Sequence, residues 1–145
     1  MRVTVSTLMA MRWSSSSACL TGALLLACVT STVREFFPSP ENPRYTPERG
    51  SAAVREYLRL RCAELAKAPK RDSATLIGRV RVDTAGKATA VQLTGTSGDE
   101  VMDGVIGTVM AQLDLAASTP RRAEYQARVA YACRDTVGAR IDVTP

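Results

Sequence analysis

The spacing of apolar residues predicts an amphipathic helix at residues 51–68. Apolar positions recur there every three or four residues, and charged residues fall between them. The apolar positions are Val54, Tyr57, Leu58, Cys62, Leu65 and Ala66. Pro69 ends the helix, because a proline cannot donate to the helical hydrogen-bond ladder.

The next two segments alternate apolar and polar residues and predict a β-hairpin. Leu76, Val80 and Val82 share one face of the first strand, at 75–83. Thr89, Val91 and Leu93 line one face of the second. Asp83 and Gly86 lie in the turn between the strands, where a glycine can adopt a positive φ.

A second helix is expected from about residue 99 to 114, followed by a third strand at 125–133. The helix has an apolar stripe of Met102, Val105, Ile106, Val109 and Leu113. Gly104 and Gly107 each cost about 1 kcal/mol in a helix interior, which suggests that they allow close packing on the sheet. The elements predict an α+β domain at residues 51–145, with a small three-stranded antiparallel sheet packed with two helices.

The first 27 residues have the pattern of an export signal. Arg2 and Arg12 precede an apolar run at 18–27 that is too short to span a bilayer. The run ends in Leu25-Leu26-Ala27-Cys28, which resembles the lipobox of bacterial lipoproteins. That resemblance implies cleavage before Cys28 and acylation of its thiol, and Val29 in place of Asp implies the outer membrane. The alternative is an ordinary secretory signal that leaves Cys28 as a plain thiol.

Net charge gives little indication of a nucleic-acid partner. Removing residues 1–27 takes away two arginines and no acids, which lowers the formal net charge from +5 to +3. The remaining Lys and Arg are scattered and lack interleaved aromatic residues, so we expect no nucleic-acid binding.

Residues 28–50 are predicted to be a proline-rich tether. Pro38, Pro40, Pro43 and Pro47 disfavour helix and sheet in this segment. About 20 residues in a polyproline-like conformation would hold the domain roughly 60 Å from the lipid headgroups. In the alternative, Phe36, Phe37 and Tyr45 dock on the domain and shorten this reach.

Residues 76–133 resemble the core of the TonB C-terminal domain family. The resemblance rests on Asp83 and Gly86 in the turn, Ser97-Gly98 after the second strand, and Met102-Asp103 in the helix. It implies the α+β fold given above, on a chain that carries a lipoprotein signal.

Cys62 and Cys133 are predicted to form a disulfide. Each lies on the apolar face of its element, so both point toward one core in an oxidising compartment. The alternative is a pair of separate buried thiols.

Catalytic chemistry is not expected. The chain contains no histidine, which removes Ser–His and Cys–His nucleophile pairs and the commonest metal ligand. Asp99, Glu100 and Asp103 cluster where a helix begins, and acids are favoured there by capping and by the helix dipole. We therefore expect no enzyme activity, metal, cofactor or small-molecule substrate.

The predicted function is that of a lipid-anchored, periplasm-facing protein-binding or scaffolding module at the outer membrane. Its partner is an envelope protein that adds a strand to an edge of the sheet. We expect the last strand to be that edge, with contacts through Tyr125, Gln126, Arg128 and Tyr131. The alternative is a structural envelope lipoprotein that contacts glycan or an assembly through basic surface residues.

Overall fold

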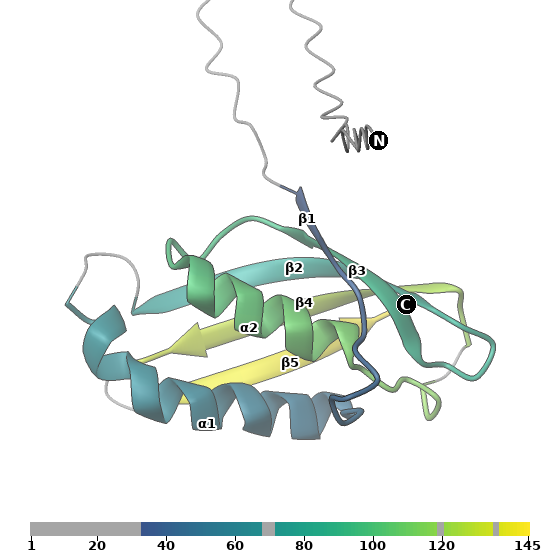
Figure 1. The fold of residues 1–145 in the computed structure, drawn as a ribbon, viewed down its shortest axis with the longest axis horizontal. Coiled ribbons are helices and arrows are strands. Elements are labelled where there is room, and N and C mark those ends of the chain that lie inside the picture. The colour runs from purple at the N-terminus through teal and green to yellow at the C-terminus, as the bar shows by residue number, and fades with distance from the viewer. Residues whose placement is uncertain (1–32, 68–71, 119–120, 135–136) are drawn as a thin grey trace, which may run out of the picture.

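A computed structural model describes residues 33–67, 72–118, 121–134 and 137–145. In these ranges two helices cover one face of a five-stranded antiparallel sheet (Figure 1). The elements in chain order are β1 (Val33–Phe36), α1 (Pro47–Leu65), β2 (Ser73–Val82), β3 (Ala88–Thr94), α2 (Glu100–Ala111), β4 (Glu124–Ala132) and β5 (Gly138–Thr144).

The predicted α+β class with two helices is confirmed, but the three-stranded sheet is wrong. The expected helix, strand, strand, helix and strand correspond to α1, β2, β3, α2 and β4. Strand β1 precedes this series and β5 follows it. The strand order is β1-β3-β2-β4-β5, so the first and last strands of the chain form opposite edges of the sheet.

The core lies between the helices and the sheet face that they cover. Strand residues alternate between this covered face and an open face, as the period of a β-strand requires. On the covered face, buried strand residues pack against the apolar stripes of both helices. The strand residues include Leu76, Val80, Val91, Leu93, Ala127 and Val129, and the helix residues include Val54, Leu58, Met102, Ile106 and Met110.

Side-chain oxygens cap the N-termini of both helices, and Asp83 accepts hydrogen bonds that stabilise the hairpin turn. Thr46 accepts a bond from the Arg49 amide at the start of α1, and Asp99 accepts one from the Met102 amide at 2.9 Å. In the turn, Asp83 Oδ1 accepts two backbone amides. Gly86 adopts φ 82°, and a Cβ there would come within 2.6 Å of the Ala116 backbone. The turn therefore docks on the segment that follows α2.

Residues 33–50 differ from the predicted proline-rich tether. Residues 33–36 pair with β3 as strand β1, and α1 begins at Pro47. Tyr45 is fixed between them, since its amide donates to Gln112 O and its carbonyl accepts from the Asp114 amide. Phe36 and Tyr45 pack against the core, as the alternative expected, whereas Phe37 stays 66% exposed. The prolines lie outside β1, which explains why this short strand can form.

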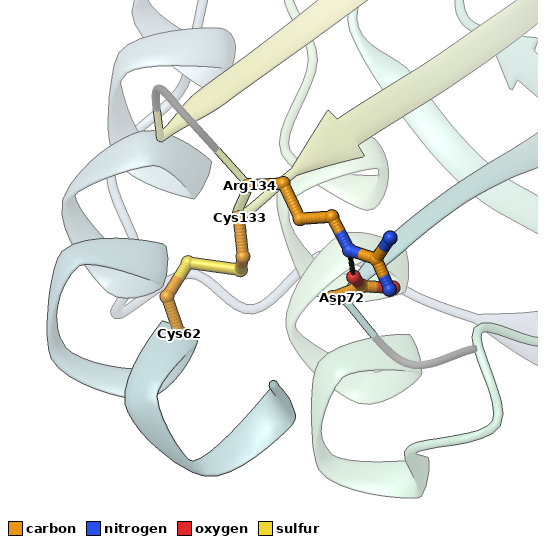
Figure 2. The surroundings of a disulfide bond; sticks show 4 residues. All are labelled: Cys62, Asp72, Cys133 and Arg134. Atoms are coloured by element: carbon orange, nitrogen blue, oxygen red, sulfur yellow. Dashed lines mark hydrogen bonds and ion pairs between the residues drawn. A yellow bond between two sulfur atoms is a disulfide. The ribbon is translucent and has the colours of Figure 1, made fainter. Parts of the chain in front are cut away.

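The predicted disulfide between Cys62 and Cys133 is present. It joins α1 to the residue after β4, with a Cα–Cα distance of 5.3 Å across a sequence separation of 71 (Figure 2). Next to it, Arg134 forms an ion pair with Asp72, and the Cys133 amide donates to Asp72 O at 2.7 Å. The disulfide thus ties the end of α1 to the sheet where β2 begins.

Candidate functional site

The strand expected to be the binding edge lies inside the sheet. β4 pairs with β2 along one side, from Ser73↔Ala132 to Arg81↔Glu124. It pairs with β5 along the other side, from Gln126↔Thr144 to Ala132↔Gly138. The prediction that this strand is the edge is therefore wrong, and its backbone is not open to an added strand. The cause is β5, which the sequence analysis did not identify.

The four residues expected to contact a partner divide between the two faces of β4. Tyr125 and Tyr131 belong to the core on the covered face. Gln126 and Arg128 are exposed on the open face. The structure therefore does not bring the four side chains together on one surface.

Charges of opposite sign are paired on the open face of the sheet. Arg79 contacts Glu124 at 3.3 Å, Arg81 contacts Glu35 at 2.5 Å, and Arg140 contacts Asp142 at 2.6 Å. Arg128 is the register partner of Asp142. Because most of these arginines have a carboxylate close by, the face is not a strongly basic surface.

Strand β5 forms one edge of the sheet, and α1 reaches part of its outer side. The Ile141 amide donates to Ser51 Oγ on α1 at 2.9 Å, so this amide points away from β4. Backbone groups alternate along an antiparallel strand, so those of Ala139 and Val143 also point outward. β5 therefore presents a row of outward backbone groups, of which the Ile141 amide is already bonded.

A hollow of about 930 Å³ adjoins this edge. Its α1 side is lined by Glu48, Ser51 and Arg55, and its β5 side by residues 137–142. The ends of β2 and β4 contribute one large residue, Tyr131, and otherwise small ones, namely Ser73, Ala74, Thr75, Ala130 and Ala132. The hollow therefore lies next to the outward backbone groups of β5.

The opposite edge is β1, which is held by three contacts to the rest of the domain. Arg34 forms an ion pair with Asp103 of α2 at 2.9 Å. Glu35 pairs with Arg81 on the open face. The ring of Phe36 lies against Gly107, where a Cβ would come within 2.4 Å of a ring carbon. The glycine in α2 thus makes space for β1.

Asp103 is the centre of a buried polar network. Its carboxylate is fully buried and accepts bonds from Arg34, from the Thr96 hydroxyl at 2.5 Å, and from the Ser97 amide at 2.7 Å and hydroxyl. This network is a physical reason for the Ser-Gly and Met-Asp pattern in the sequence, since Ser97 binds the aspartate that follows Met102. Asp99 caps α2, and Glu100 is exposed in its first turn.

Tyr131 lies at the edge of this network. Burial raises the pKa of the Tyr131 phenol above its ordinary value, and a hydrogen bond with Ser97 opposes this shift. The negative charge of Asp103 raises the pKa further. The Ser97 and Thr96 hydroxyls both donate to the Asp103 carboxylate, and the carboxylate and Ser97 are buried, so we interpret the cluster as structural.

Metal-ligating groups do not gather in the part of the chain that the structure describes. No group of three or more Cys, Asp or Glu side chains there could hold a metal ion. The predicted lipidation site, Cys28, and the predicted signal at residues 1–27 lie outside the described residues.

Comparison of the chain with known protein families, curated proteins and solved structures gives no match. Among the described residues, no helix has the length and apolar character needed to cross a membrane. The candidate site is therefore defined by the geometry of the two sheet edges. The residues that shape these edges, Ser51 beside Ile141 and Arg34 beside Asp103, could not be predicted from the sequence, because each pair joins distant segments.

Proposed function

We propose that the chain is a lipid-anchored, periplasm-facing module that binds an extended segment of an envelope protein at the β5 edge. The observation that carries this proposal is the row of outward backbone groups on β5 beside an open hollow. Strand addition needs both features, because backbone hydrogen bonds supply affinity while alternate side chains of the peptide need space.

In the free domain, Ser51 occupies a backbone amide of this edge that we propose a partner strand takes over. In the free domain Ser51 Oγ accepts the Ile141 amide and donates to Pro47 O at 2.7 Å. A carbonyl of the added strand replaces Ser51 as the acceptor, and Ser51 keeps its own bond to Pro47. The free edge thus has no unsatisfied amide at Ile141, and an added strand must displace Ser51 from that amide.

Charged residues around the hollow favour a peptide of mixed charge. Glu48 and Arg55 stand on α1, and Arg140 and Asp142 alternate with buried residues along β5. Hydrogen bonds from its own backbone amide and from Thr46 lower the pKa of Glu48, so its carboxylate is charged at neutral pH. Opposite charges on the peptide would set its register.

The lipid anchor and the periplasmic location are supported by two features of the chain. Leu25 to Cys28 follow an apolar run of lipoprotein type. The Cys62–Cys133 disulfide is typical of a domain that works in an oxidising compartment. The TonB C-terminal-like character of the domain rests on the sequence pattern of Asp83, Gly86, Ser97-Gly98 and Met102-Asp103.

Site-specific photo-crosslinking in the native envelope tests the proposal. A benzophenone amino acid replaces Arg140, whose side chain is exposed beside the edge. We expect capture of one envelope protein. Adding Val143→Pro removes an outward amide without removing a bond to β4, and should lower capture at least tenfold. Val143→Ala keeps the amide and should keep capture.

Circular dichroism is used to check that both variants are folded before their capture is compared. Undiminished capture with a folded Val143→Pro variant, or no capture with the parent protein, would overturn strand addition at β5. Salt separates this mode from binding of glycan or an assembly through basic residues. A charge-driven contact weakens steeply as salt rises, whereas backbone pairing changes little. The ion pairs on the open face give that alternative no support.

A further inference from the structure

We propose that the β1 edge of the domain lies against the bilayer surface, with the β5 edge facing away from it. The inference rests on the proposed acylation of Cys28. It assigns an orientation to the domain and commits to a lipid surface as the occupant of the β1 edge.

The length of chain between Cys28 and β1 is the first argument. Val33 begins β1, and five Cα–Cα steps separate it from Cys28. Consecutive Cα atoms are 3.8 Å apart, so this segment cannot exceed about 19 Å in any conformation. An acyl chain on Cys28 therefore holds the start of β1 close to the headgroups. A tether of 60 Å is not available.

Exposed apolar side chains around this edge are the second argument. Val33 is 57% exposed at the start of β1, and Phe37 follows the strand and is also exposed. Val101, in the first turn of α2, is 55% exposed. The Arg34–Asp103 ion pair brings the start of β1 and the first turn of α2 together. Three of the six exposed large apolar residues of the described chain thus border β1 or the helix end beside it.

Charge at this edge is locally balanced. Arg34 is paired with Asp103 and Glu35 with Arg81, while Glu100 is exposed next to Val101. The edge has no cluster of basic residues to bind anionic headgroups. Contact with lipid should therefore depend on apolar side chains and on the anchor, and it should be insensitive to salt.

The strand order then places the binding edge on the far side of the sheet. β1 and β5 are separated by the three strands between them, and neighbouring strands lie about 4.8 Å apart. The β5 edge is therefore about 19 Å from the β1 edge. Figure 1 shows β1 on the side of the domain away from α1, and α1 lies beside β5. This orientation leaves β5 accessible from the periplasm.

Tryptophan fluorescence provides the test. The chain has one tryptophan, Trp13, which lies in the predicted signal, so the cleaved protein has none. Val101→Trp places a reporter beside β1. Leu60→Trp places one on α1, where Leu60 is 77% exposed, and serves as the matched control. Each lipidated protein is purified from membranes and reconstituted in phosphatidylcholine vesicles whose acyl chains carry bromine.

We expect bromine to quench at least half of the Val101→Trp emission and to leave the Leu60→Trp emission nearly unchanged, at low and at high salt. Flotation of the vesicles reports the anchor separately. Floated protein with an unquenched Val101→Trp would overturn this inference and leave the anchor intact. Shielding of Val101→Trp by a second copy, seen as a crosslinked dimer without quenching, would also overturn it. Protein that fails to float would overturn both the anchor and the orientation. Binding at β5 is measured independently with Val143→Pro.

Discussion

Two glycines in α2 provide a matched test of how β1 is held. Gly104 has nothing within 4 Å of the position that a Cβ would occupy. At Gly107 a Cβ would lie 2.4 to 2.5 Å from three ring atoms of Phe36. Real Cβ contacts are about 1 Å longer, so Gly107→Ala requires the ring to move. Both substitutions remove a helical glycine, and they should differ in sign.

The expected magnitudes follow from these contacts. Gly104→Ala should stabilise the protein by up to about 1 kcal/mol, the difference in helix propensity. Gly107→Ala gains the same amount, but displacing a packed ring costs about 2 to 3 kcal/mol. The net effect is a loss of about 1 to 2 kcal/mol. Phe36 is only partly buried, which favours the lower end of this range.

Urea unfolding followed by circular dichroism measures both effects. A double variant tests whether the loss of stability in Gly107→Ala comes from contact with Phe36 of β1. When Phe36→Ala removes the ring, adding Gly107→Ala should become stabilising, by about as much as Gly104→Ala. Equal stabilisation by Gly104→Ala and Gly107→Ala in the parent protein would refute the packing of Phe36 on α2.

Four further predictions follow from the disulfide, the Asp103 network and the strand order. Replacing both Cys62 and Cys133 by alanine should cost about 4 kcal/mol in the chain-entropy model; a reductant should lower the melting temperature of the parent but not of this variant. Because burial raises the pKa of Tyr131, unfolding releases its proton more readily above pH 10, so stability should fall from pH 10 upward. Tyr131→Phe should flatten that part of the stability profile, and an unchanged slope would contradict the assignment. Asp103→Asn should cost about 2 to 3 kcal/mol in urea unfolding, because an amide cannot accept every bond that reaches the carboxylate. Arg128→Pro should unfold the domain by circular dichroism, since β4 is paired on both sides, whereas Val143→Pro should not.

The sequence pattern predicted the elements whose apolar residues recur over more than one turn or several strand positions. The helix expected at 51–68 is α1, and the strand expected at 125–133 is β4 within one residue. The disulfide was also predictable, because Cys62 and Cys133 each fall on an apolar face. These features depend on local periodicity, which a single sequence carries.

The two edge strands were missed for different reasons. β1 has four residues and lies just before a proline-rich segment, and its stability comes from distant partners such as Asp103 and Gly107. Nothing local in the sequence indicates those contacts. β5 did carry a signal, because Ala139, Ile141 and Val143 alternate with Arg140 and Asp142. This alternation indicates a strand after β4, and such a strand places β4 inside the sheet.

The strand order has a consequence for how the chain folds from its N-terminus onward. β2 has its longest pairing with β4, which is made about 50 residues later, and Cys62 must wait for Cys133. Until β4 and β5 are available, β2 lacks its partner β4, and apolar residues of the helices remain exposed to solvent. A product truncated before residue 124 should therefore be a substrate for proteases rather than a smaller folded unit. The domain can therefore complete its fold only when residues 124–145 are available.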